Sequence, residues 1–127
     1  ATDHAPHSKE EKFTSFTKAS FGIVGLETAF ALTMTELVET GVITLRQMVE
    51  KLSVNPAKIL NISKGCIAEG WIADLVIADP EAVYNIDAIQ FYSKGKHSPF
   101  DGRKVKGRIT HTFVKGKLKY HDERYGN

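Results

Sequence analysis

The feature that most constrains the fold is a change in the texture of the sequence near residue 62. Between residues 26 and 60, apolar side chains recur at steps of three and four, which places them on one face of a helix. Beyond residue 62, short runs rich in Ile, Val, Phe and Tyr are separated by glycines, which is typical of strands and turns. The sequence therefore predicts helices first and a small sheet second.

Three helices are predicted before residue 62. The first covers residues 26–40 and ends at Gly41, and its apolar face consists of Leu26, Phe30, Met34, Leu37 and Val38. The second begins at a capping box formed by Thr44 and Gln47, and its buried face consists of Leu45, Met48, Val49 and Leu52. Asn55-Pro56 repeats a start signal, with Asn as N-cap and Pro at the first helical position, and opens a short third helix.

The residues before these helices lack a regular period. Residues 9–20 alternate charged, hydroxyl and aromatic side chains and are predicted to form a long loop. The segment from Phe21 to Gly25 has two glycines around an apolar pair, which predicts a tight turn before the first helix.

Two stretches of the second half predict strands. Residues 73–80 form a nearly continuous apolar run closed by Asp79-Pro80, so this strand is expected at the centre of the sheet with both faces covered. Residues 108–120 alternate around Lys115-Gly116 and predict a β-hairpin. Asp74 and Asp79 are expected to accept backbone hydrogen bonds at turns.

Composition narrows the class of protein. The 127 residues are 42% hydrophobic, which is enough for one domain with a core. The net charge of +2 is mild and its basic residues are spread along the chain, so no nucleic-acid partner is expected, and residues 94–106 are interpreted as a solvated loop. No apolar run approaches the ~20 residues of a membrane span and no secretory pattern is present, which predicts a cytoplasmic protein without a membrane partner. The single Cys66 fits a reducing compartment and is expected to be a small buried apolar side chain.

The chemically richest stretch opens the chain. Asp3, His4 and His7 bring a carboxylate and two imidazoles together within five residues, after a short run that is suited to finish a strand. Asp3 can ligate a metal or carry a proton, and His7 can hydrogen-bond a substrate. Taken by itself, Asp3 is more simply explained as a turn or N-cap carboxylate. Because Ala1 is not an initiator Met and the sequence begins as if inside a strand, the chain is expected to be a fragment or a processed product.

Four separated segments of the chain carry a resemblance to a known family: Thr2–His7, Phe21–Thr28, Gly65–Asp79, and Ser98–Gly102 leading to Thr112–Gly116. In these segments the chain resembles the dihydroorotases of the metal-dependent amidohydrolase superfamily. The third marks the superfamily, whereas the first two point to dihydroorotase, since hydantoinases and allantoinases usually carry a different residue set after the Asp-His pair. The resemblance spans nearly the whole chain.

The resemblance implies an α/β fold in which a (β/α)8 barrel is joined to a small β-sandwich built from both chain ends. A complete barrel takes about 250 residues, so this chain is expected to hold only the C-terminal part: the last barrel strand with its helices over residues 1–62, and the C-terminal strands of the sandwich over 63–127. The family's His-x-His pair, its bridging carboxylate and its further metal-binding histidines would lie outside this chain. None of the five histidines here forms a His-x-His pair, so the chain alone is not expected to assemble a two-zinc centre.

The reaction implied by the resemblance is reversible hydrolysis of the cyclic amide of dihydroorotate to N-carbamoyl-aspartate in pyrimidine biosynthesis. A zinc pair lowers the pKa of bound water to about 7 and so supplies the nucleophile. By resemblance, Asp3 is the catalytic proton carrier and a metal ligand, and His7, Phe21 and Gly22 bind the substrate, the last two through their backbone. His4 is expected to have a supporting structural role.

Alternatives remain open at this stage. Another cyclic amidohydrolase, an allantoinase or a hydantoinase, would share the metal chemistry and differ in the substrate pocket. From a different class, the chain would be a non-catalytic dihydroorotase-like assembly module. A homo-oligomer and a transcarbamoylase partner are both compatible with the sequence, and His97, His111 and His121 match no functional position of the family.

Overall fold

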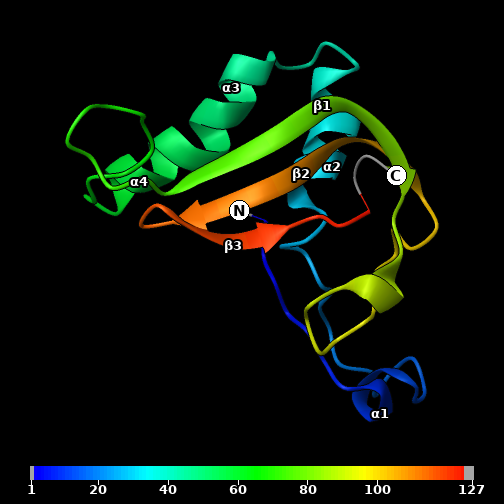
Figure 1. Ribbon diagram of the computed structural model, residues 1–127. Helices are drawn as coiled ribbons and strands as arrows, with labels where there is room; N and C mark the ends of the chain where they lie inside the picture. The colour runs from blue at the N-terminus through cyan, green and yellow to red at the C-terminus, as the bar shows by residue number, and fades with distance from the viewer. Residues whose placement is uncertain (1, 125–127) are drawn as a thin grey trace.

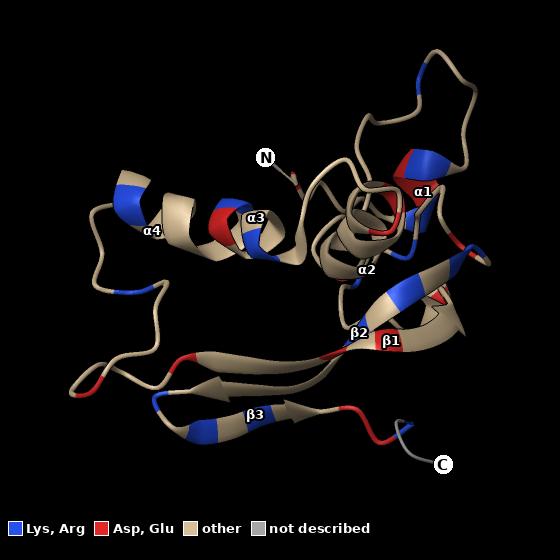
Figure 2. Ribbon diagram, turned by 90° about the horizontal axis from the view of Figure 1, so that it is seen from above, with Lys and Arg blue, Asp and Glu red and all other residues tan. Residues whose placement is uncertain are grey.

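The computed structural model describes residues 2–124, in which short helices precede a three-stranded antiparallel sheet (Figure 1). The sheet has the order β1-β2-β3. Seen from above, α2, α3 and α4 all lie on one side of the sheet (Figure 2). The elements are α1 (Lys9–Lys12), α2 (Ala29–Thr33), η1 (Met34–Val38), α3 (Leu45–Val49), η2 (Glu50–Val54), α4 (Asn55–Ile59), β1 (Leu75–Asn85), η3 (Ala88–Gln90), β2 (Lys104–Val114) and β3 (Lys117–His121).

The first predicted helix is confirmed as a helical run, but it is shorter than predicted. It consists of α2 and the π-helical η1, in which the Glu39 amide donates to the Met34 carbonyl at 2.9 Å. Gly41 follows with a φ of +75°, the left-handed conformation that glycine adopts without strain. Met34 is 2% exposed, whereas Leu26 is 63% exposed because it lies in the turn before the helix. The buried face is therefore narrower than the sequence predicted.

The second helix begins as predicted. The Thr44 hydroxyl oxygen accepts from the Gln47 amide at 3.2 Å, and the Gln47 side-chain oxygen accepts from the Thr44 amide at 2.8 Å. Met48 is buried, but Leu45, Val49 and Leu52 are between 40% and 49% exposed, so most of the predicted buried face is wrong for this chain.

The predicted new start at Asn55-Pro56 is wrong, because α3, η2 and α4 form one continuous helical run. Asn55 has helical backbone angles and does not act as N-cap. A proline inside a helix lacks an amide donor and crowds the carbonyl four residues earlier. Here the five residues before Asn55-Pro56 widen into π-helical geometry, which accommodates that crowding without ending the helix.

The hairpin is confirmed, and the position of the first strand is corrected. β2 and β3 are joined by Lys115 and Gly116, whose φ values of 52° and 73° suit a two-residue hairpin turn. β1 was expected at the centre of the sheet, but within the described residues it pairs only with β2 and lies at the edge, with Val76 59% exposed. It also continues past Asp79-Pro80, because the pairing is irregular between Asp79 and Val83 and tolerates a residue without an amide donor.

The residues around the first strand test two further expectations. Asp74 accepts from the Lys115 amide at 2.8 Å, which confirms the predicted backbone bond. Asp79 also accepts a backbone bond, from the Glu81 amide at 2.8 Å, but it lies inside β1 and not at a turn that ends the strand. Cys66 was expected to be buried but is exposed, because residues 61–74 form no helix or strand and pack little against the core.

The core joins the helices to the sheet. Ala31 of α2, Ile86 and Val105 of β2 form its buried centre, and Leu32, Tyr84, Phe91 and Phe100 pack against them. Gly107 of β2 lets the helix approach closely, since a Cβ there would lie 2.7 Å from the Met34 side chain. Among residues 2–124, no helix is long and apolar enough to cross a membrane.

Candidate active site

The opening segment of the chain lies against the stretch that precedes α2. The Ala5 amide donates to the Ile23 carbonyl at 2.9 Å, and Nε2 of His7 lies 2.6 Å from the Phe21 carbonyl oxygen. Gly22 has a φ of +119°, and a Cβ at this position would lie 2.4 Å from the Ala5 Cβ. His7, Phe21 and Gly22 are thus brought together although they are far apart in sequence. The approach requires glycine at residue 22.

Phe21 takes part through its backbone. Its side chain is 94% exposed, while its carbonyl oxygen faces the His7 ring. The expectation that Phe21 and Gly22 contact a substrate through backbone atoms stays a prediction, and the structure leaves the Phe21 ring available on the surface.

The Asp3 carboxylate takes no part in the contact among His7, Phe21 and Gly22. Its side chain is exposed, its φ is 54°, and Oδ1 accepts from the His4 amide at 2.7 Å. The left-handed conformation is uncommon for residues other than glycine, although Asp adopts it more readily than most. Its carboxylate hydrogen-bonds to its chain neighbour and not to His7, Phe21 or Gly22. Residues 2–7 form no strand, since the Ala5–Ile23 bond is their backbone link to this stretch.

His4 fastens the opening segment to the start of the helical region. Its Nδ1 accepts from the Gly25 amide at 3.3 Å and from the Leu26 amide at 3.4 Å. A nitrogen that accepts carries no proton, which places the ring proton of His4 on Nε2. This is a structural contact of the kind expected for His4.

A one-turn helix that sequence reasoning missed supports the site. Residues 9–20 were expected to be a loop, yet α1 forms because the Ser8 hydroxyl accepts from the Glu11 amide at 3.2 Å and the Glu11 carboxylate accepts from the Ser8 amide at 2.8 Å. The Ser8-x-x-Glu11 spacing of a capping box would have revealed it. The hydrogen bond from the Ser8 amide lowers the pKa of the Glu11 carboxyl group. The Glu11 carboxylate also lies 3.6 Å from Nδ1 of His7.

Lys12, at the end of α1, was also missed. Its ammonium group donates to the Ser20 carbonyl at 2.8 Å and to the Gly22 carbonyl at 2.6 Å. These two bonds hold the carbonyls on either side of Phe21, so Lys12 fixes the backbone that faces His7.

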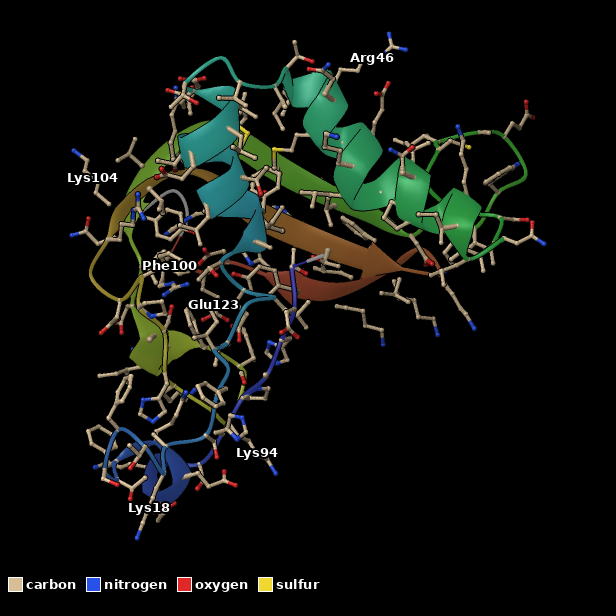
Figure 3. All side chains as sticks on the ribbon, turned by 180° about the vertical axis from the view of Figure 1, so that it is seen from behind. Lys18, Arg46, Lys94, Phe100, Lys104 and Glu123 are labelled. Atoms are coloured by element: carbon tan, nitrogen blue, oxygen red, sulfur yellow. The ribbon has the colours of Figure 1, made fainter. Side chains whose placement is uncertain are left out.

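The second half of the chain contributes a supporting loop. The Glu27 carboxylate accepts from the Tyr92 amide at 2.8 Å and the Ser93 amide at 2.9 Å, and the Val24 amide donates to the His97 carbonyl at 3.2 Å. Lys94 of this loop and Lys18, which follows α1, lie at the same end of the molecule (Figure 3). No local pattern marks these contacts, which join residues more than 60 positions apart.

The described residues do not form a complete catalytic zinc site by themselves. A catalytic zinc takes three protein ligands, and in residues 2–124 no three His, Cys, Asp or Glu side chains gather at a common point. Asp3 offers one exposed carboxylate, with Oδ1 already engaged by an amide. This is a donor suited to one position of a metal site whose other ligands come from elsewhere.

A cavity of about 530 Å³ lies away from these residues. It is located between α2 and the sheet and is lined by Tyr84, Arg108 and Tyr120 among others. Asp3, His7, Phe21 and Gly22 are not in its wall. The candidate active site is therefore an open junction of two segments.

In a comparison of sequences, the chain is similar to several dihydroorotases. The dihydroorotase of Thermoanaerobacter sp. (strain X514) is 52% identical over 124 residues, which cover 98% of this chain and 28% of that protein. The dihydroorotase of Clostridium acetobutylicum is 46% identical over 123 residues, covering 97% of this chain and 29% of that protein. The chain thus spans little more than a quarter of the length of these relatives.

Solved structures of related enzymes have the same fold. A D-hydantoinase from Bacillus sp. AR9 superposes with a TM-score of 0.85 at 29% identity, covering 96% of this chain and 28% of that one. A dihydropyrimidinase from Brevibacillus agri NCHU1002 superposes with a TM-score of 0.87 at 28% identity, covering 98% and 28%. The model of the Amidohydrolase family matches residues 1–119. The chain belongs to the amidohydrolase family.

Proposed function

We propose that this chain is the C-terminal portion of a dihydroorotase, and that the longer protein hydrolyses the cyclic amide of dihydroorotate reversibly to N-carbamoyl-aspartate. The observation that carries the proposal is the junction of residues 3–7 with residues 21–25, held by the Ala5–Ile23 hydrogen bond and the His7–Phe21 contact. Both segments are those in which the sequence resembles dihydroorotase. The identity of 46–52% to two dihydroorotases supports the same choice.

The proposed division of the chain follows the fold. Residues 1–62 would be the end of a (β/α)8 barrel with its last strand, and residues 63–127 the C-terminal strands of a small β-sandwich. The helical run that ends at Ile59 and the sheet that begins at Leu75 support a boundary between them. Residues 2–7 would gain strand pairing only from neighbouring barrel strands outside this chain.

The proposed roles are carried by four residues. Asp3 is the catalytic residue, with Oδ2 as the oxygen that remains to take a proton or to serve as one metal ligand. His7 binds the substrate through its ring, and Phe21 and Gly22 bind it through their backbone. A zinc pair, when bound by the longer protein, supplies a hydroxide nucleophile near neutral pH. The activity is proposed for the longer protein, since this chain provides one metal ligand. The reaction would belong to pyrimidine biosynthesis in the cytoplasm. The longer protein would act as a homo-oligomer or with a transcarbamoylase partner.

An assay of the longer, metal-loaded protein tests the proposal. We expect interconversion of dihydroorotate and carbamoyl-aspartate, and we expect Asp3→Asn to abolish it. Glu69→Gln, which alters an exposed carboxylate in the loop after α4, is the matched control and should retain full activity. Loss of activity in Asp3→Asn with an unchanged zinc content would separate proton transfer from metal binding. An Asp3→Asn protein with undiminished turnover would remove the proposed role of Asp3.

A hydantoinase or an allantoinase is the second candidate. The observation that favours a hydantoinase is the structural similarity to hydantoinases and a dihydropyrimidinase, which includes a 39% identical L-hydantoinase from Arthrobacter aurescens over 80% of this chain. A panel of dihydroorotate, hydantoin and allantoin distinguishes these activities. A longer protein that turns over none of them would instead support a non-catalytic assembly module.

A further inference from the structure

Two histidines face each other across the hairpin. His111 of β2 and His121 of β3 are direct cross-strand partners, and their ring centroids are 4.6 Å apart with an angle of 32° between the planes. β3 lies at the edge of the sheet, with its last residues near the C-terminal end of the described chain (Figure 1). Neither histidine lines the cavity, whereas Tyr120, the neighbour of His121, does, so the pair lies on the opposite face of the sheet.

The hydrogen bonds around Thr110 fix the tautomer of the His111 ring. Thr110 is the extra residue of a β-bulge opposite Ile77, and its hydroxyl donates to the Ile77 carbonyl at 3.1 Å. Because the hydroxyl has one hydrogen, its oxygen can only accept from Nδ1 of His111, 3.0 Å away. His111 therefore carries its proton on Nδ1 and keeps the Nε2 lone pair available. A histidine oriented in this way by a hydrogen bond on its other nitrogen is the usual form of a metal ligand.

The second ring is also available. The imidazole of His121 makes no hydrogen bond to another described residue, and its side chain is exposed. The Phe113 ring stacks beside His111 at 6.4 Å between centroids and 13° between planes, which limits the orientations open to the His111 ring.

The separation of the two rings matches that of two imidazoles on one metal ion. A bond from zinc to a histidine nitrogen is about 2.0–2.1 Å long, so the ring centroid lies about 3.2 Å from the metal. Two such rings at coordination angles of about 90–109° have centroids about 4.5–5.2 Å apart. The observed 4.6 Å lies within this range, so the separation of the two rings is compatible with both binding one ion.

We propose that His111 and His121 form a binding site for a divalent transition-metal ion that favours imidazole nitrogen, namely Zn²⁺, Ni²⁺ or Cu²⁺. Water completes the coordination, since no third His, Cys, Asp or Glu of residues 2–124 joins the pair. The bound ion links the edge strand β3 to β2 and stabilises the hairpin. The site does not depend on the proposed function, because its two ligands and their geometry belong to this chain.

Titration of the chain with Ni²⁺, followed by NMR, tests the proposal. We expect paramagnetic broadening of the amide signals of Thr112 and Tyr120, which are neighbours of the two histidines, at less than one equivalent of Ni²⁺. His121→Gln should weaken binding by about tenfold or more and remove this broadening. His97→Gln is the matched control, because the His97 ring packs against Phe13 in another part of the molecule, and it should leave the broadening unchanged.

Thermal unfolding gives an independent measurement. The Tm should rise with Ni²⁺ concentration in the unaltered chain, since an ion that binds only the folded state stabilises it, and His121→Gln should remove this rise. His121 is exposed at the end of an edge strand, so this variant keeps the packing of the core. Broadening that persists at Thr112 and Tyr120 in His121→Gln, or none in the unaltered chain at a tenfold excess of Ni²⁺, would overturn the proposal.

Discussion

Replacement of Gly22 by alanine tests the contact that joins the two segments of the candidate active site. At this position the backbone φ is +119°, and a new Cβ would lie 2.4 Å from the Ala5 Cβ and 2.8 Å from the Ala5 carbonyl oxygen. Neither neighbour is the end of a flexible side chain, so the backbone around Ala5 would have to move away.

The magnitude follows from two contributions. Holding a non-glycine residue in a sparsely populated backbone region costs about 1–3 kcal/mol, and forcing a methyl group into occupied space costs about 1–3 kcal/mol more. The junction should therefore open more easily by about 2–6 kcal/mol. Gly41→Ala is the matched control, because Gly41 also has a positive φ, +75°, but nothing lies within 4 Å of its Cβ position. Its cost should be limited to about 1–2 kcal/mol and should act elsewhere.

Amide hydrogen exchange at Ala5 is the direct measurement, since this amide donates to the Ile23 carbonyl across the junction. Local opening that becomes easier by about 2 kcal/mol speeds exchange about 30-fold, because each 1.4 kcal/mol is a factor of ten. The Met48 amide in α3 should be unaffected, which shows that the change is local. An Ala5 amide that exchanges in Gly22→Ala within threefold of its rate in the unaltered chain, or no faster than in Gly41→Ala, would contradict this prediction.

Two further predictions concern charged side chains. Lys12→Met removes both bonds that hold the carbonyls beside Phe21, and in the longer protein it should raise the KM for dihydroorotate about tenfold, since a hydrogen bond to a charged group contributes about 1.5–3 kcal/mol; an unchanged KM would contradict this role. Asp122 is 3% exposed, and although burial would raise its pKa, hydrogen bonds from Arg124 and the charges of Arg108 and Arg124 lower it overall. A lowered folded-state pKa stabilises the fold above the unfolded-state pKa of about 3.9 and loses this stabilisation as the pH falls through the folded-state value. Asp122→Asn should thus reduce the free energy of unfolding, measured in urea, by about 2 kcal/mol at pH 7 and by less at pH 3. The loss is smaller than for a fully buried ion pair because Arg124 is half-exposed. An equal loss at both pH values would exclude the Asp122 charge as the cause.

Local sequence patterns predicted the parts of this fold that local interactions determine. Thr44 and Gln47 form their capping box within one turn of chain, and the Lys115-Gly116 turn needs only two residues with positive φ. The same kind of pattern at Ser8 and Glu11 was overlooked because the surrounding residues showed no helical period. The prediction that a new helix starts at Asn55-Pro56 was wrong because the preceding helix continues through these residues, so no N-cap is needed there.

Long-range contacts determine the features of the fold and the site that local sequence patterns did not predict. Whether the apolar run after residue 73 becomes a central or an edge strand depends on which strands flank it, and the residues of the run do not determine this. The contact of His7 with the Phe21 carbonyl and the two bonds from the loop after η3 to Glu27 depend on how the two halves of the chain meet. Resemblance to a family named the residues of the candidate site, but only the structure showed that the Asp3 carboxylate hydrogen-bonds to the His4 amide and not to the other three.

The position of β1 at the edge of the sheet has a consequence for the behaviour of the chain in solution. An uncovered strand edge offers a row of unpaired amide and carbonyl groups to any other extended chain, and exposed apolar side chains beside the edge favour such pairing. β1 is eleven residues long, and its Val76, Ile77 and Val83 are more than half exposed. Natural edge strands are usually blunted by short length, lysines or a covering segment. In β1, Pro80 and the irregular pairing between Asp79 and Val83 interrupt the edge, and the exposed apolar side chains on either side of them are the surface through which the chain would self-associate.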